Sequence, residues 1–248
     1  MNYPKAVKDF LKEKKYNQIQ LKAVLFDMDG VLYDSMKYHA IAWSKSTKKY
    51  GINFNEEDAY LHEGRTRIDT INWAYQRQFE RDASEEEIKK IYDLKEEEFN
   101  KFPKTTPMIG TKQLLEKIKK NNLTAIVVTG SSQESLLNKL EKDYPNTFQS
   151  KSMVTAFDVK QGKPHPEPYL KALKKGGLKP NEAIVIENAP LGVESAVAAG
   201  IFTIGVNTGP LDDAVLTESG ANLLLPSMED LANQWEELYN ALNGISLD

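Results

Sequence analysis

The feature that most constrains this fold is the segment LKAVLFDMDGVLYD at residues 21–34, where an apolar run ends in two closely spaced aspartates. Five of the six residues 21–26 are apolar, which is typical of a strand buried on both faces, as in a parallel sheet. Ligands of open α/β sheets collect at the carboxyl ends of the strands, where Asp27 and Asp29 follow. Gly30 allows a sharp turn there. Because two close carboxylates repel, we expect a cation or a proton to hold them together; an ordinary Asp- and Gly-containing turn is the alternative.

The composition describes a globular protein with a sizeable core. The chain has 248 residues, 40% hydrophobic and 27% charged, which suits one large domain or a core domain with an insert. The net charge is -4 without a basic face, so a nucleic-acid partner is not expected. No apolar run approaches the roughly 18 residues of a membrane span, and the N-terminus lacks the apolar stretch of a secretory signal. Absence of cysteine excludes disulfides and thiol catalysis, so we expect a cytoplasmic protein.

The order of predicted elements indicates an α/β fold with a doubly wound parallel sheet and an inserted helical cap. Residues 1–20 are predicted to form a lysine-rich helical extension on the surface. Residues 34–105 contain only predicted helices, at 38–50, 56–61, 68–79 and 84–99, the last beginning with a capping box at Ser84. Residues 21–33 and 106–248 alternate strands with helices, as a doubly wound core does. The remaining predicted core elements are helices 110–121, 167–175 and 191–199, a further helix between 132 and 152, strands 124–128, 183–186 and 203–206, and a short apolar segment at 152–156.

Polar side chains recur at the ends of the later strands. Thr129 follows the strand at 124–128, Lys163 lies in a loop between glycine and proline, and Glu187 and Asn188 follow the strand at 183–186. Each has a structural alternative, namely a helix N-cap, a surface loop lysine and turn chemistry. Their succession at consecutive strand ends favours one common site.

The four motifs DMDGV, VVTGS, GKPHPEPY and IENAPLGV together resemble the haloacid dehalogenase superfamily of phosphotransferases, over about two thirds of the chain. The insert lies at the cap position of its β-phosphoglucomutase-like branch. The stretches LHEGRT, VTAFDVK, GKPHPEPYLKALKKGGL and VIENAPLGVESA look most like members of that branch described as inorganic pyrophosphatases. The resemblance implies a Rossmann-like core and a magnesium-dependent phosphohydrolase.

The resemblance assigns Asp27 as a nucleophile that forms an aspartyl-phosphate and Asp29 as the acid and base that serves the leaving group and the attacking water. Cations would keep Asp27 ionised, whereas Asp29 must be able to carry a proton. Magnesium would bind Asp27 and the backbone carbonyl of Asp29.

Residues of two further motifs are implied to handle the phosphoryl group. Thr129, with the amides of Gly130 and Ser131, would hold phosphoryl oxygens near a helix start. Lys163 would supply a fixed positive charge for Asp27 and the transferring group, since phosphoryl transfer depends mainly on positioning and charge neutralisation.

The sequence departs from the family pattern at Asn188, where an aspartate commonly binds magnesium. Glu187 could compensate, directly or through a metal-bound water. Glu63, in the cap sequence LHEGRT, is a second candidate, with Gly64 providing a tight turn. We hypothesise that Glu63 joins the magnesium shell when the cap closes, and that Arg65 binds a second phosphoryl group or a substrate tail. An exposed loop with unremarkable charges is the alternative reading of this segment.

Hydrolysis of inorganic pyrophosphate is therefore the leading hypothesis. A β-phosphoglucomutase-like sugar-phosphate mutase and a small sugar-phosphate phosphatase are the alternatives, and a non-catalytic module of the same fold is disfavoured by the intact motifs. The expected partner is a small phosphorylated substrate, and a monomer is preferred to an oligomer. We expect His39 to be packed or exposed rather than to face the site. We expect Trp43 and Trp73 to belong to the cap core.

Overall fold

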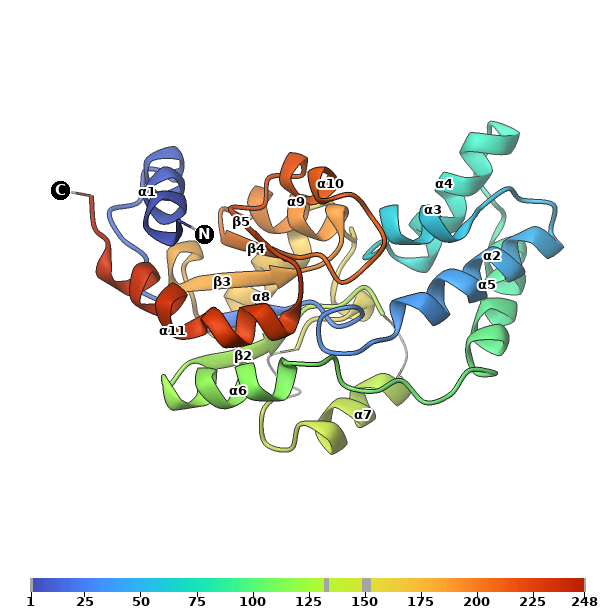
Figure 1. The fold of residues 1–248 in the computed structure, drawn as a ribbon. Helices are drawn as coiled ribbons and strands as arrows, with labels where there is room; N and C mark the ends of the chain where they lie inside the picture. The colour runs from blue at the N-terminus through green and yellow to red at the C-terminus, as the bar shows by residue number, and fades with distance from the viewer. Residues whose placement is uncertain (1, 132–133, 149–152, 248) are drawn as a thin grey trace.

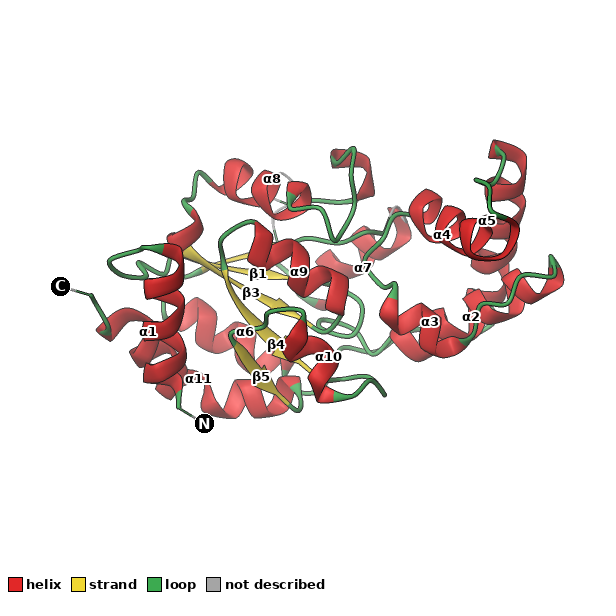
Figure 2. Cartoon of the chain, turned by 90° about the horizontal axis from the view of Figure 1, so that it is seen from above, coloured by secondary structure: helices red, strands yellow, loops and turns green. Residues whose placement is uncertain are grey.

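The computed structural model describes residues 2–131, 134–148 and 153–247 of the chain. A five-stranded sheet forms its centre, with strand order β2-β1-β3-β4-β5 and every neighbouring pair parallel (Figure 1). Helices cover both faces of this sheet (Figure 2), which confirms the predicted α/β class. The strands are β1 (Ala23–Phe26), β2 (Thr124–Val127), β3 (Ala183–Glu187), β4 (Phe202–Val206) and β5 (Leu223–Leu225).

The apolar run before Asp27 occupies the middle of the sheet, between β2 and β3. Val24 and Phe26 point into one hydrophobic cluster, while Ala23 and Leu25 point into the other. Because successive side chains of a strand face opposite sides, a run without polar residues is required at this position. The buried strand thereby fixes where its carboxyl end, and hence Asp27, must lie.

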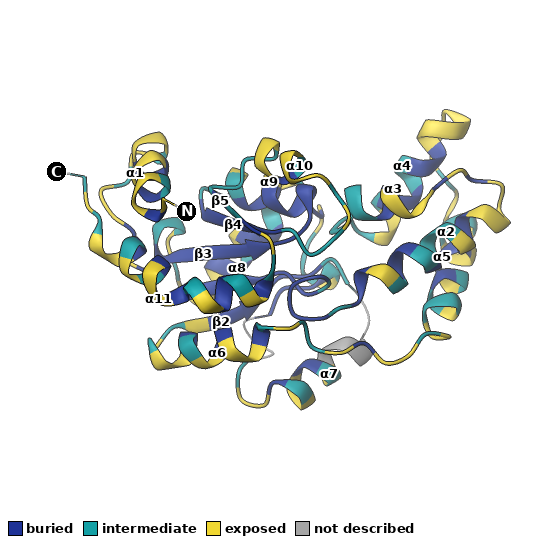
Figure 3. Cartoon of the chain, viewed as in Figure 1, coloured by how far each residue is buried: buried dark blue, intermediate teal, exposed yellow. Residues whose placement is uncertain are grey.

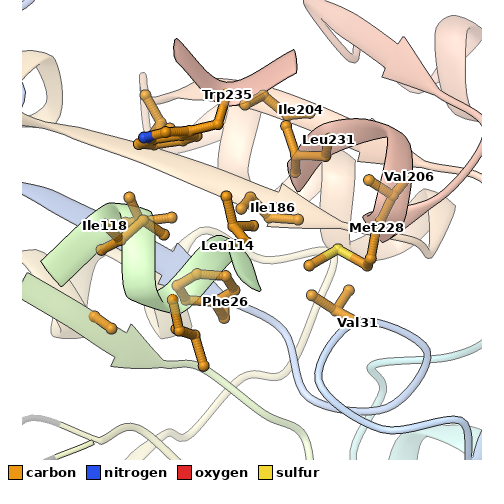
Figure 4. Packing of buried hydrophobic residues seen from close by; sticks show 14 of the residues in the cluster. Phe26, Val31, Leu114, Ile118, Ile186, Ile204, Val206, Met228, Leu231 and Trp235 are labelled. Atoms are coloured by element: carbon orange, nitrogen blue, oxygen red, sulfur yellow. The ribbon is translucent and has the colours of Figure 1, made fainter. Parts of the chain in front are cut away.

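The helices of the core divide between the two faces. On one face, Phe26 and Ile186 pack under Leu114 of α6 (Thr111–Lys120) and Trp235 of α11 (Met228–Gly244), as Figure 4 shows. On the other face lie α8 (Glu167–Gly176) and α9 (Pro190–Ala198). The remaining core helices are α7 (Glu134–Asp143), α10 (Asp213–Glu218) and the short 3-10 helices η2 (Ala156–Asp158) and η3 (Pro180–Glu182).

The four helices between β1 and α6 stand beyond the carboxyl ends of the strands, at the right of Figure 1. They are α2 (Met36–Lys49), α3 (Glu56–Leu61), α4 (Arg67–Phe79) and α5 (Glu85–Phe99). They enclose a hydrophobic cluster of their own that includes Ile71, Ala74 and Ile91. The capping box at Ser84 is confirmed, since its hydroxyl accepts from the amide of Glu87 and the Glu87 carboxylate accepts from the amide of Ser84. The cap helices thus have a core separate from that of the sheet.

The N-terminal helix is shorter and more deeply packed than predicted. Helix α1 (Tyr3–Lys14) ends at Lys15, which adopts a left-handed conformation with φ of 58°, so the prediction of one helix over residues 1–20 is wrong. The apolar face of α1, including Val7 and Phe10, is fully buried with the main cluster while the opposite face is exposed (Figure 3). Burial of this face favours a structural contribution to the core over a loose surface attachment.

Two other regions differ from the sequence-based prediction. Ser152 of the predicted apolar segment 152–156 lies outside the described residues; within the described part, Val154 makes only an isolated parallel bridge to Val128. Strand β5 and helices α10 and α11 were not predicted. None of the helices in the described part of the chain is long and apolar enough to span a bilayer.

Candidate active site

Asp27 and Asp29 lie immediately beyond the carboxyl end of β1. The backbone amide of Asp27 donates to Ile186 O at 3.1 Å, which holds it beside β3. Gly30 has φ of 84°, and a Cβ there would lie 2.2 Å from Nδ2 of Asn188. Gly30 therefore serves both the left-handed turn and the close approach of Asn188 to the aspartate loop.

Lys163 lies almost completely buried against these carboxylates. Its ammonium forms a salt bridge with Asp27 Oδ1, lies 2.6 Å from Glu187 Oε1 and donates to Val128 O at 3.3 Å. Burial disfavours the charged ammonium, but the attraction of Asp27 and Glu187 outweighs burial and raises the pKa of Lys163. Three acceptors and this pKa shift keep the lysine charged.

Glu187 holds Lys163 in position through a hydrogen-bonded salt bridge. Its Oε1 accepts from the lysine and from the Tyr169 hydroxyl at 2.7 Å, while its Oε2 accepts from the amides of Asn188 and Ala189 at 3.1 and 3.2 Å. Both carboxylate oxygens therefore already have protein partners. This arrangement argues against the hypothesis that Glu187 contacts magnesium directly.

The two aspartates differ in ionisation in a way that departs from the sequence-based expectation. Burial raises the pKa of Asp27 to about 7, although Lys163 acts in the opposite direction. Burial also opposes ionisation of Asp29, but the nearby His39 and Ser35 outweigh it and lower the pKa of this carboxyl. Without a further cation, Asp27 is thus harder to ionise than Asp29. The negative charges of Glu187 and Asp29 raise the pKa of Asp27 in addition to the effect of burial.

A histidine and a lysine from the cap helices face Asp29. Nε2 of His39 lies 3.3 Å from Asp29 Oδ1, its Nδ1 lies 2.9 Å from Nζ of Lys95, and Ser35 donates to Asp29 Oδ1 at 2.5 Å. Burial, with Lys95 adding to it, lowers the pKa of His39, and burial lowers that of Lys95 to about 8. If the lysine donates to Nδ1, the imidazole proton resides on Nε2 and faces the Asp29 carboxylate.

His39 is therefore both packed and directed into the site. Its ring stacks on Phe99 with centroids 4.1 Å apart, as a packed histidine would, but it also lines the same cavity as Asp27 and Asp29. Sequence analysis favoured a histidine away from the site. The missing signal was Lys95, which is distant in sequence and meets His39 only because α2 packs against α5.

The cap loop carrying Glu63 contacts the core directly. Nδ2 of Asn188 donates to Glu63 Oε2 at 3.0 Å, and both Glu63 Oε1 and Asn188 Oδ1 are buried without a hydrogen-bond partner. Gly64, with φ of 87°, lies against the Lys163 side chain, where a Cβ would meet Cδ at 2.7 Å. A Cβ on Gly130 would come within 2.7 Å of the Gly64 carbonyl oxygen. The two glycines thus permit a close cap–core contact that brings Glu63 to Asn188.

Asp27, Asp29 and Glu63, together with other residues of the core and the cap, line a partly open cavity of about 270 Å³. Thr129 lies in it beyond the end of β2, and its hydroxyl accepts from the amide of Ser131 at 3.0 Å. Arg65 also lines the cavity, and its Nε donates to Nδ1 of His62 at 3.3 Å. Trp43 belongs to the edge of the cap core, as predicted, but it also lines the cavity. The cavity therefore combines carboxylates, cations and an aromatic wall.

The donor set suits a hard divalent cation. Within the described residues, no three His, Asp or Glu side chains are arranged so as to hold a metal by themselves. The oxygens of Asp27, Glu63 and Asn188, with the Asp29 backbone carbonyl, would instead offer a mixed set of the kind magnesium accepts. The two buried oxygens without partners, on Glu63 and Asn188, are the observation that fits a cation, since such atoms are costly unless satisfied.

The family model of the haloacid dehalogenase-like hydrolases matches residues 24–206. This chain belongs to that family. The match runs from β1 to the end of β4, and so includes the whole cap and every residue named for the candidate site.

Solved and curated relatives extend this result. A Bacteroides vulgatus structure that carries the provisional name β-phosphoglucomutase is 57% identical, with a TM-score of 0.94, over 97% of this chain and 98% of its own. Hexitol phosphatase A of Escherichia coli is 34% identical over 86% of this chain and 94% of its own length. Pyrophosphatase PpaX of Oceanobacillus iheyensis is more distant, at 22% identity over 86% and 96%. The family is thus that of phosphatases and mutases of small phosphorylated compounds.

Proposed function

We propose that this protein is a magnesium-dependent phosphohydrolase that acts on inorganic pyrophosphate. The observation that carries the proposal is the contact between Asn188 of the core and Glu63 of the cap, with one unpartnered buried oxygen on each side chain. A cation held by both residues would link cap closure to metal binding. Closed in this way, the cavity of about 270 Å³ would be small and shielded from solvent, as binding of a small polyanion requires.

Asn188 in place of the usual aspartate has a physical explanation in this proposal. An aspartate could not donate a hydrogen bond to Glu63 and would repel it, whereas the asparagine amide donates with Nδ2 and leaves Oδ1 for the cation. The carboxylate lost from the core is thereby supplied by the cap. The metal-binding residues proposed are Asp27, Asp29 through its carbonyl, Asn188 and Glu63.

In the proposed reaction, Asp27 attacks a phosphoryl group to form an aspartyl-phosphate, and Asp29 protonates the departing phosphate. Asp29 then accepts a proton from the water that hydrolyses the intermediate. Lys163 balances charge on Asp27 and the transferring group, and Thr129 holds a phosphoryl oxygen. Magnesium would lower the pKa of Asp27, which burial and the nearby carboxylates raise to about 7 against the effect of Lys163, and would neutralise phosphoryl charge.

The leaving phosphate would lie on the cap side of the cavity. Arg65 lines this part and would bind the second phosphoryl group through its planar guanidinium. His39 and Lys95 would act through Asp29, holding its carboxylate and supplying its proton. Glu187 would hold Lys163 in place rather than ligate the ion.

Sugar-phosphate hydrolysis or isomerisation is the second candidate. Trp43 and Tyr92 line the cavity, and aromatic faces suit the apolar side of a sugar ring. Other curated relatives are named as phosphatases of phosphorylated carbohydrates or of 2-deoxyglucose 6-phosphate. The two candidates use the same Asp27 and Asp29 and differ in the group that accepts or leaves with the phosphate.

Phosphate release with magnesium should be measured for pyrophosphate, glucose 1-phosphate, glucose 6-phosphate and an aryl phosphate, with a coupled assay for isomerisation of glucose 1-phosphate. We expect pyrophosphate to be turned over best. Isomerisation of the sugar phosphate without turnover of pyrophosphate would replace the first candidate by the second. For the metal site, Glu63→Ala with unchanged magnesium dependence and turnover would remove Glu63 from it.

A further inference from the structure

The side chain of Arg65 is held by a contact on its cap side that the proposed reaction does not require. Its Nε donates to Nδ1 of His62 at 3.3 Å, and both residues line the cavity. An arginine side chain has many rotamers, and it binds a phosphoryl group efficiently only when its orientation is fixed beforehand. The neighbour that restricts Arg65 therefore bears on how well the site recognises a second anionic group.

His62 is itself fixed from two directions. Its ring lies on the indole of Trp73, with centroids 3.7 Å apart, and its backbone amide donates to Asp58 O at 3.0 Å. The guanidinium of Arg77 lies over the Trp73 ring, 4.4 Å from its centre. Arg77 in turn binds the Asp58 carboxylate with two hydrogen bonds of 2.8 and 3.2 Å. This closed set of contacts leaves the imidazole little freedom to turn.

The hydrogen bond between Arg65 and His62 also determines which ring nitrogen of His62 carries the proton. Arginine can only donate, so the His62 Nδ1 that faces it must be unprotonated and accept. The imidazole proton then resides on Nε2. His62 is thus an acceptor of fixed position, whose only described side-chain hydrogen bond is to Arg65.

We propose that His62, braced by Trp73, is a positioning residue that directs Arg65 toward the second phosphoryl group of the substrate. The inference rests on the proposed function, because it deepens the role of Arg65 there. It makes His62 a determinant of specificity: substrates with a second anionic group depend on it, whereas phosphate esters with an uncharged leaving group do not. Trp73, which sequence analysis expected in the cap core, then has the second role of supporting this histidine.

Two substitutions separate the acceptor from the ring. His62→Phe keeps an aromatic ring on Trp73 but removes the acceptor, whereas His62→Asn removes the ring but keeps an oxygen at the position of Nδ1. We expect His62→Phe to lower kcat/KM for pyrophosphate about tenfold, mainly through KM, which corresponds to about 1.4 kcal/mol. We expect it to leave kcat/KM for an aryl phosphate within about twofold, and His62→Asn to retain most pyrophosphate activity. Equal losses on both substrates, or a larger loss in His62→Asn than in His62→Phe, would overturn the proposal.

A double-mutant cycle tests whether His62 acts through Arg65. In the Arg65→Ala background, His62→Phe should have no further effect on kcat/KM for pyrophosphate, because the side chain it positions is gone. Additive losses would refute the inference while leaving pyrophosphate hydrolysis intact. If the wild type does not hydrolyse pyrophosphate, the proposed function fails; the same cycle on a substrate that it does use and that carries a second anionic group then decides the inference, with additivity overturning it and coupling upholding it.

Discussion

Replacing Asn188 by aspartate would restore the residue common in the family, yet we expect it to impair this protein. Nδ2 of Asn188 donates to Glu63 Oε2 at 3.0 Å. The substitution Asn188→Asp removes this hydrogen bond and places a second buried carboxylate next to that of Glu63. Burial, with Asp27 adding to it, already raises the pKa of Glu63 well above its ordinary value. A second carboxylate at this distance therefore makes closure of the cap with both groups ionised unfavourable.

The size of the effect follows from these contacts. Loss of a hydrogen bond to a charged group costs about 1.5–3 kcal/mol. Two like charges about 4 Å apart repel by about 4 kcal/mol at an effective dielectric constant of about 20. Uptake of a proton by one carboxyl, or binding of magnesium between them, relieves part of this repulsion. We therefore expect a remaining cost of about 3 kcal/mol at limiting magnesium, or a roughly 100-fold loss in kcat/KM for pyrophosphate.

The assay is a magnesium titration of kcat/KM at two pH values. The deficit of Asn188→Asp should shrink as magnesium rises, and also as pH falls, because a protonated carboxyl can again donate to its neighbour. A matched control is the double variant Glu63→Gln with Asn188→Asp, which keeps the net charge and reverses the direction of the hydrogen bond. It should recover part of the lost activity. An Asn188→Asp variant that equals the wild type at every magnesium concentration would refute this reasoning.

Three further substitutions test other parts of the site. His39→Gln should lower kcat about tenfold with unchanged magnesium dependence, because it removes the imidazole beside Asp29, the proposed acid and base; a changed magnesium midpoint instead of a changed kcat would contradict this. Gly162→Ala should raise KM severalfold without altering the melting temperature, since its Cβ would lie 2.9 Å from Cγ2 of Thr66 in the cap; an unchanged KM would show that this contact is dispensable. Asp58→Asn should cost about 1 kcal/mol of stability at pH 7. Burial opposes ionisation of Asp58, but Arg77 outweighs it and lowers the pKa, so the stabilisation exists above the ordinary carboxyl pKa and is lost as pH falls. Thermal unfolding should show the difference narrowing below about pH 4, and a constant difference would exclude the mechanism.

The sheet and the residues at its strand ends could be predicted because their signals are local. An apolar run followed by Asp27 determines both the strand and the position of the carboxylate, and the same holds for Thr129 after β2. Glu63 could be placed near this edge only through resemblance to a family. Nothing in the cap sequence itself indicates that Gly64 would pack against Lys163.

The parts that escaped prediction depend on contacts between distant segments. Lys95 reaches His39 through the packing of α2 on α5, and Tyr169 reaches Glu187 from a separate helix. Likewise, the order of pKa values at Asp27 and Asp29 depends on how many charges the fold places around each one. Periodicity predicts which face of a helix is apolar, but it does not identify the segment that will cover it, as α1 illustrates.

The most direct test of the central claim is the ratio of kcat/KM for pyrophosphate to that for glucose 1-phosphate, measured with magnesium in the wild type and in Glu63→Gln. We expect the wild type to prefer pyrophosphate by at least about tenfold, and the variant to lose this preference, because Glu63 brings charge and closure to the small cavity. A wild type that favours glucose 1-phosphate, or a ratio unaffected by Glu63→Gln, would contradict the account.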